Sequence, residues 1–119
     1  MLFKPELVTK ILSGQKTVTR RRLTQGRHIP YQVGHTYAVQ PGRGKQHVGH
    51  IRIRLIEKQC LFEVRGWRQV RAEGFLTIGQ FRDYWRRLHH GYNEYELVAV
   101  LRFELVGRCP KCLPWEPKT

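Results

Sequence analysis

The feature that most constrains this chain is a long segment, Leu7 to Ile56, that contains no acidic side chain. Such a segment cannot form an ion-pair network of its own, because a network needs both signs of charge. A one-sided positive field attracts phosphate backbones and speeds their arrival. We therefore expect a polyanionic partner, with a charged surface that serves only solubility as the alternative. The basic residues of the segment are Lys10, Lys16, Arg20, Arg21, Arg22, Arg27, Arg43, Lys45, Arg52 and Arg54.

Length and composition predict a single folded domain. A chain of 119 residues with a net charge of +13 is too short for two packed domains. Leu, Ile, Val and Phe supply 33 residues, which is enough for a hydrophobic core. The longest apolar run, Leu97 to Leu101, is far shorter than the roughly 20 residues that span a bilayer. No signal-peptide pattern follows Met1, so we expect a cytoplasmic protein without membrane contact.

Two helices are predicted. The first begins at Pro5, which suits a first helical position, and ends at Gly14, with apolar residues at helical spacing between them. The second follows a capping box formed by Thr77 and Gln80, and Gly91 ends it. Its apolar face, whose aromatic rings we expect to be structural, consists of Phe81, Tyr84, Trp85 and Leu88.

Four segments have the composition of strands: Lys16 to Arg22, Thr36 to Gln40, His47 to Ile56, and Glu96 to Leu105. The last alternates apolar residues on both faces, which suits a central strand that is covered on two sides. The third predicts an inward-facing row made of Ile51, Ile53 and Leu55. These elements predict an α+β domain whose sheet must close or be covered to protect its edges.

The most specific local pattern is G-x-K-x-x-T-x-R over Gly14 to Arg21, between the first helix and the first strand. It resembles the signature of the ASCH superfamily, whose domains are similar to the PUA fold. The resemblance continues in the expected order through Met1 to Phe3, Tyr31 to Val39, Ala72 to Phe75, and Phe103 to Glu104. It covers residues 1–106 and implies a PUA-like β-barrel of about five or six strands flanked by two helices. Residues 107–119 are expected to form an irregular tail.

The ASCH resemblance also implies a cleft for RNA or a nucleotide-sized ligand. Members of the family are associated with RNA binding, one branch deacetylates N4-acetylcytidine, and a ribonuclease is known. In the amidohydrolase branch the working residues are a Lys and a Thr of the motif and a Glu before the second helix. Carried over by position, these are Lys16, Thr19 and Glu73. The resemblance thus implies an RNA-associated protein without a cofactor, either a hydrolase or a non-catalytic RNA-binding module.

These three residue types can cleave an amide. A Thr hydroxyl is a weak nucleophile and needs an adjacent base, which a neutral Lys16 amine provides once burial or nearby cations favour proton loss. Glu73 then protonates the leaving nitrogen or activates water. Residues three apart in a strand face opposite sides, so this chemistry requires Lys16 to lie in the turn after Gly14. The alternative is that Lys16 and Thr19 are surface residues and that Glu73 only pairs with an arginine.

Other basic residues are expected to contact RNA phosphates, with one large aromatic residue stacked on a base. Trp67 lies among Arg65, Arg68 and Arg71, which suits stacking, although a packing role is the alternative. The six histidines should strengthen binding below about pH 6.5 as they gain charge. The residues expected to contact RNA are Arg20, Arg21, Arg22, Arg43, Lys45, Arg52, Arg54, Trp67 and Arg68.

Cys109 and Cys112 have the C-x-x-C spacing of half a zinc site. A complete site needs two more ligands, for which Cys60 and His89 or His90 are the obvious suppliers, but a second C-x-x-C is missing. A thiol or disulfide clip of the tail and a plain loop are the alternatives, and we predict no metal. The sequence does not indicate an oligomeric state.

Overall fold

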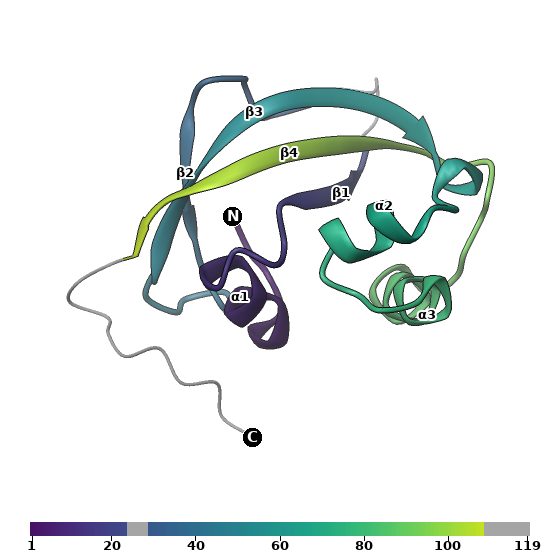
Figure 1. Ribbon diagram of the computed structural model, residues 1–119, viewed down its shortest axis with the longest axis horizontal. Coiled ribbons are helices and arrows are strands. Elements are labelled where there is room, and N and C mark those ends of the chain that lie inside the picture. The colour runs from purple at the N-terminus through teal and green to yellow at the C-terminus, as the bar shows by residue number, and fades with distance from the viewer. Residues whose placement is uncertain (24–28, 109–119) are drawn as a thin grey trace.

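The computed structural model describes residues 1–23 and 29–108. In chain order its elements are α1 (Pro5–Leu12), β1 (Val18–Arg22), β2 (Thr36–Val39), β3 (Gly49–Cys60), the 3-10 helix η2 (Leu61–Glu63), α2 (Trp67–Ala72), α3 (Ile78–His89) and β4 (Leu97–Arg108). β3 and β4 arch side by side across the molecule (Figure 1). α1 lies beneath the end that carries β2, whereas α2 and α3 lie beneath the other end.

The four strands of the described residues form one antiparallel sheet in the order β1-β4-β3-β2. This confirms the α+β class, but the open sheet differs from the barrel of five or six strands that the resemblance implies. The edge strands β1 and β2 have only five and four residues. Closing a barrel requires a ladder between the two edges, and no strand in the described part of the chain supplies it.

Both predicted helices are present. α1 buries its apolar residues, and Gly14 follows it in the left-handed conformation at φ 83°. Thr77 caps α3, because its hydroxyl accepts a hydrogen bond from the Gln80 amide at 3.2 Å. His90, with φ 59°, takes the left-handed position at the end of α3 that was expected of Gly91. α2 is a third helix that the sequence did not predict. Across residues 1–23 and 29–108, no helix has the length and hydrophobicity needed to cross a membrane.

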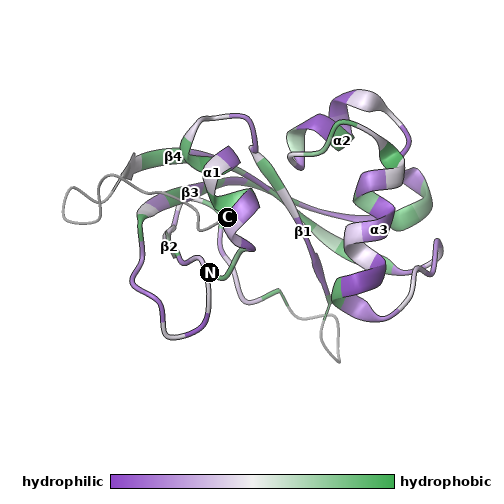
Figure 2. Cartoon of the chain, turned by 90° about the horizontal axis from the view of Figure 1, so that it is seen from below, coloured by the Kyte–Doolittle hydropathy of each residue, from purple (hydrophilic) through white to green (hydrophobic). Residues whose placement is uncertain are grey.

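β4 is the predicted central strand, and an apolar cluster packs against each of its faces. One cluster joins Leu101 and Phe103 to the buried face of α1. The other joins Val98 to α2 and α3, where Phe81 and Trp85 are each 1% exposed. Figure 2 shows polar and apolar residues alternating along α3, as a helix with one buried face requires. β4 therefore contributes to two separate apolar clusters, one with α1 and one with α2 and α3.

β3 departs from the predicted alternation at one point. Ile51 and Ile53 are fully buried as predicted, but Leu55 is 42% exposed. The register with β4 shifts between Ile53 and Leu55, and Arg54 has no partner at this β-bulge. A slip of one residue reverses the face of every residue that follows, so Ile56 packs against the α1 cluster in place of Leu55.

β4 runs to Arg108, two residues past the predicted domain boundary at residue 106. Gly107 pairs with His50 of β3, so this part of the expected tail belongs to the sheet. Cys109 and Cys112 lie outside the described residues. Cys60 is a free thiol, and the described residues contain no group of three or more His, Cys, Asp or Glu side chains that could hold a metal ion.

Candidate functional site

Lys16 is a buried cation just before β1. The left-handed Gly14 turns the chain out of α1, so Lys16 lies in the turn that the catalytic hypothesis requires. The residue is 2% exposed. Its Nζ donates to the backbone oxygens of Val18 at 2.7 Å and Glu73 at 2.8 Å, and to the Glu73 carboxylate at 3.2 Å. Three acceptors match the three N–H bonds of an ammonium group, so these contacts suit the charged form of Lys16.

Glu73 follows the last residue of α2 and is 3% exposed. One carboxylate oxygen accepts from Lys16, and the other accepts from Arg20 Nη1 at 2.8 Å. Arg20 Nε and Nη2 both donate to the Gln59 side-chain oxygen, at 3.0 and 2.9 Å. Nη2 also donates to the Gln69 side-chain oxygen at 2.9 Å. We call Lys16, Arg20, Gln59, Gln69 and Glu73 the buried ionic cluster.

Burial lowers the pKa of Lys16 from its ordinary value, and the Glu73 carboxylate opposes this shift. Arg21 and Arg20 add to the lowering, since nearby positive charges disfavour another cation. Proton loss from Lys16 is therefore easier than from an exposed lysine. This is the direction of shift that the predicted base requires, although the contacts of Nζ suit an ammonium group.

Thr19 lies apart from the other two predicted catalytic residues. It pairs with Leu101 of β4, whereas Arg20 pairs with Val100. Directly paired residues share a face of the sheet, so the Thr19 and Arg20 side chains leave β1 on opposite faces. The Thr19 hydroxyl makes no hydrogen bond to Lys16 or Glu73, all three of which are described residues. The structure thus brings Lys16 and Glu73 together without the predicted nucleophile.

The placement of Arg20 differs from its expected role in RNA binding. The residue is 7% exposed, and each of its three nitrogens donates within the buried ionic cluster. A phosphate has no access to this guanidinium. Arg20 instead connects β1 to α2, and the Thr17 amide, just before β1, donates to the Ala72 oxygen of α2 at 2.9 Å. The buried ionic cluster therefore holds together segments from the two ends of the sheet.

A hollow of about 500 Å³ lies beside β1, between the start of α1, the turn at residues 41–43 and α3. Three cations line it, Lys4, Arg21 and Arg43, and none of its described lining residues is acidic. Tyr84 and His89 of α3 add rings to its wall. We call this site the basic hollow. Its combination of cations and rings is typical of surfaces that bind nucleic acid.

Arg21 connects the sequence motif to the basic hollow. Its guanidinium lies 4.7 Å from the centre of the Phe3 ring, and its Nη2 donates to the Leu2 backbone oxygen at 2.7 Å. Its Nε has no hydrogen-bond partner among the described residues. These contacts orient the guanidinium by packing. The unpartnered Nε is itself buried, so the donor left for an anion is Nη1, which makes no hydrogen bond with the described residues.

The two rings from α3 are neutral at pH 7. Burial raises the pKa of the Tyr84 hydroxyl above its ordinary value, so it remains a hydrogen-bond donor. Burial lowers the pKa of His89, and the positive charge of Arg22 adds to this shift. Neutral rings at the wall of a cationic hollow suit the stacking of an unpaired base.

Three of the predicted RNA contacts are already in ion pairs. Arg22 lies 2.5 Å from a carboxylate oxygen of Glu96. Arg52 and Arg54 share Glu104, at 3.7 and 2.5 Å. Such exposed pairs are weak, but each carboxylate reduces the positive field of its partners. These arginines are therefore less suited to phosphate binding than their number suggests.

The remaining predicted contacts are accessible. Lys45 is exposed in the turn that carries Arg43. Trp67 is 64% exposed, and the guanidinium of Arg68 lies 5.3 Å from the centre of its ring. Arg71 also lies over this ring, at 5.7 Å. The alternative that Trp67 is a packing anchor does not agree with this exposure, so base stacking stays a prediction for it.

Sequence reasoning missed three residues of the basic hollow: Lys4, Tyr84 and His89. Lys4 precedes the acid-free segment, and His89 was considered only as a metal ligand. Tyr84 was assigned to the core because it shares a helical face with Trp85. A usable signal is the position of Tyr84 on the flank of this apolar face. The structure shows that it is only partly buried there.

No family model and no curated protein matches this sequence. Solved structures are similar over most of the chain. An ASCH domain from Lactobacillus crispatus has a TM-score of 0.66 and 22% identity, over 84% of this chain and 70% of that one. The chain has an ASCH-like fold. This confirms the ASCH-like fold that the motif at Gly14 to Arg21 predicted, but not the closed barrel or its number of strands.

Two further structures extend the similarity to the ASCH-like fold. An ASCH protein from Zymomonas mobilis has a TM-score of 0.61 and 20% identity, over all of this chain (100%) and 81% of that one. A protein from Enterococcus faecalis described by the family model DUF984 has a TM-score of 0.69 and 17% identity, over 91% of this chain and 79% of that one. At these identities the similarity concerns the fold alone.

Proposed function

We propose that this protein is an RNA-binding module that holds an RNA segment or a nucleotide in the basic hollow. The observation that carries the proposal is the lining of this hollow, which combines three cations and two neutral rings without an acidic residue among its described residues. Lys and Arg position phosphates, and rings stack on unpaired bases. The net charge of +13 adds long-range attraction for the same polyanion.

The contacts of the buried ionic cluster support binding more than turnover. Lys16 Nζ already donates to three acceptors, so it is not directed at the Thr19 hydroxyl. Both carboxylate oxygens of Glu73 accept from cations, so neither is directed at a substrate. In this arrangement the cluster positions β1, and therefore Arg21, beside the basic hollow.

Amide hydrolysis is the second candidate function, and two observations favour it: Lys16 and Glu73 are in contact, and burial lowers the pKa of Lys16. Thr19 would attack the acyl carbon of an N4-acylated cytidine while Lys16 takes the hydroxyl proton. The cytidine amine would leave with a proton delivered through Glu73, and water would then release the acid from Thr19. This chemistry requires Lys16 to release one of its acceptors and the Thr19 hydroxyl to reach it.

Kinetics on an N4-acylated cytidine separate the two candidates. For a hydrolase, the rate rises with pH through a Lys16 pKa below the ordinary value, and Thr19→Ala abolishes turnover with affinity within a few fold. For a binding module, neither the protein nor Thr19→Ala shows turnover. Activity that survives Thr19→Ala would eliminate Thr19 as the nucleophile.

The binding proposal is tested with a fluorescein-labelled single-stranded RNA, titrated by anisotropy at several salt concentrations. We expect affinity to fall steeply with salt, because Lys and Arg contacts release counterions. Arg43→Gln should reduce the slope of the log–log plot by about 0.7, the value for one lost phosphate contact to a single strand. Arg102→Gln is the charge-matched control, because Arg102 is exposed on β4 and does not line the basic hollow. A salt-independent affinity, or equal effects of the two variants, would contradict the proposal.

A further inference from the structure

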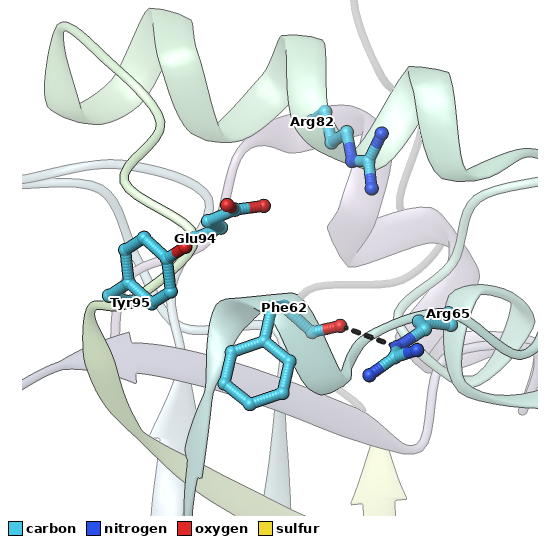
Figure 3. Close-up of a pocket in the computed structure, with 5 residues that line it drawn as sticks. All are labelled: Phe62, Arg65, Arg82, Glu94 and Tyr95. Atoms are coloured by element: carbon cyan, nitrogen blue, oxygen red, sulfur yellow. Dashed lines mark hydrogen bonds between the residues drawn. The ribbon is translucent and has the colours of Figure 1, made fainter.

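A second hollow, of about 380 Å³, lies at the opposite side of α3, and Figure 3 shows the five residues that line it. These residues, which we call the Tyr95 hollow, are Phe62, Arg65, Arg82, Glu94 and Tyr95. Tyr95 is 73% exposed and Phe62 is 38% exposed, with their ring centres 6.4 Å apart. The volume is within the range of small-ligand sites. Exposed aromatic rings in a hollow of this size offer faces on which a base can stack.

Hydrogen bonds hold the segments that form the Tyr95 hollow. The amide of Phe62 donates to the Glu94 backbone oxygen at 2.8 Å, which ties η2 to the loop before β4. The side chain of Asn93 accepts from the Tyr95 amide at 3.0 Å. Arg65 Nε donates to the Phe62 backbone oxygen at 3.0 Å, a bond that Figure 3 displays. Binding therefore requires little ordering of this loop, which favours affinity.

The charges of the Tyr95 hollow are not neutralised internally. Within the described residues, neither Arg65, Arg82 nor Glu94 takes part in an ion pair. Arg65 lies 5.6 Å from the centre of the Phe62 ring, and Arg82 lies 5.6 Å from that of Tyr92. Two cations, two exposed rings and one carboxylate are the groups that recognise phosphates, base faces and base amino groups.

The Tyr95 hollow is distinct from the basic hollow. Arg82 and Arg86 are one helical turn apart on α3, and both border the loop that carries Tyr95. Tyr84 and Leu88 are also one turn apart, and both line the basic hollow. Two residues along a helix correspond to a rotation of about 200°, so these two pairs face nearly opposite directions. An RNA strand that passes around α3 can occupy both hollows.

We propose that the Tyr95 hollow binds one unpaired RNA nucleotide whose base carries an amino group, an inference that rests on the RNA-binding function proposed above. The base stacks on Tyr95, and the Phe62 ring, which is inclined at 58° to that of Tyr95, contacts the base from the side. The Glu94 carboxylate accepts hydrogen bonds from the amino group. Arg65 and Arg82 bind the flanking phosphates. Guanine fits best, because it presents two adjacent donors to one carboxylate, whereas uracil presents one donor between two carbonyl oxygens.

The test measures affinity for three labelled probes: a dodecamer of uridine, the same strand with one central guanosine, and a blunt RNA duplex. Tyr95→Ala should weaken binding of the guanosine strand about tenfold and leave duplex binding unchanged, because a paired base cannot stack on the ring. Tyr95→Phe, which keeps the ring, should bind like the original protein. Val33→Ala is the control for loss of an exposed apolar side chain, since Val33 is 56% exposed and lines neither hollow.

Glu94→Gln should reduce the preference for the guanosine strand over the uridine strand, with little change in affinity for uridine. Arg65→Gln should lower the salt slope by about 0.7 for both strands. Because these side chains are exposed, the thermal midpoint of each variant should match that of the original protein.

The outcomes separate this inference from the proposed function. If Arg43→Gln weakens binding but Tyr95→Ala and Glu94→Gln do not, the Tyr95 hollow is not a nucleotide site and the basic hollow still is. If only the Tyr95 and Glu94 variants are affected, the basic hollow is the wrong assignment and the inference holds. If the original protein binds none of the three probes, both proposals are wrong.

Discussion

The buried ionic cluster and the Tyr95 hollow use the same residue types in opposite ways. In the cluster, Glu73 lies between two buried cations, and each of the three side-chain nitrogens of Arg20 donates within the protein. In the Tyr95 hollow, Glu94 and Arg65 are exposed and make no ion pair with a described residue. A charge removed from water must have a partner, whereas an exposed charge is solvated without one. Burial therefore decides whether an arginine stabilises the fold or is open to a ligand.

The largest expected effect is that of Glu73→Gln. It removes the carboxylate and leaves Lys16 and Arg20 as uncompensated buried cations, so unfolding should become easier by about 3–5 kcal/mol. Urea denaturation measures this difference. The matched control is Glu104→Gln on the surface, which should cost under about 1 kcal/mol because its arginines remain solvated. Equal losses in the two variants would mean that the cluster is solvated and that the comparison fails.

The next largest effect is the difference in stability between variants of two arginines, Arg20 and Arg65. Arg20→Gln removes buried charge-assisted hydrogen bonds and should destabilise the protein by about 1.5–3 kcal/mol. Arg65→Gln removes an exposed cation and should change stability by less than about 0.5 kcal/mol. Thermal unfolding measures the first loss, and RNA titration measures the binding effect of the second. If the Arg20 variant kept native stability but bound RNA more weakly, Arg20 would be an RNA contact, as the sequence predicted.

A smaller effect concerns the pH dependence of stability near Lys16. Its pKa is lower in the folded protein than the ordinary value of 10.5, so between these two values the unfolded chain binds more protons. Stability from this residue is complete above pH 10.5 and is lost as the pH falls through the folded pKa. Lys16→Met should lack this part of the profile when the two proteins are compared by urea denaturation at successive pH values. Identical profiles would show that Lys16 keeps its ordinary pKa.

The smallest effect concerns His89, whose partial exposure is intermediate between the residues of the buried ionic cluster and those of the Tyr95 hollow. Its folded pKa is lower than 6.5, so its contribution to stability is present above pH 6.5 and is lost as the pH falls through the folded pKa. We expect a small drop in thermal midpoint on acidification that is absent in His89→Gln. Any gain in RNA affinity from His89 should also begin below pH 6.5, and a gain centred above it would contradict the lowered pKa.

The sequence determined the elements whose signals are local. The helices at α1 and α3 and the four strands follow from hydrophobic spacing and caps, which involve residues only a few positions apart. The motif from Gly14 to Arg21 predicted the ASCH-like fold, but the composition assigned Lys16 to a strand that begins only at Val18 in the structure. The contact between Lys16 and Glu73 followed from the family resemblance, because no local pattern connects residues so far apart in the chain.

The tertiary structure decided which charges are buried and which face solvent. Arg20 stands among three consecutive arginines, and its partners Gln59, Gln69 and Glu73 are 39, 49 and 53 residues away. The bulge that turns Leu55 outward depends in the same way on the register of β3 with β4. Burial and cross-strand register are set by neighbours that are distant in the sequence. Composition and periodicity therefore identify a charged strand, but they do not show which of its charged side chains another element will bury.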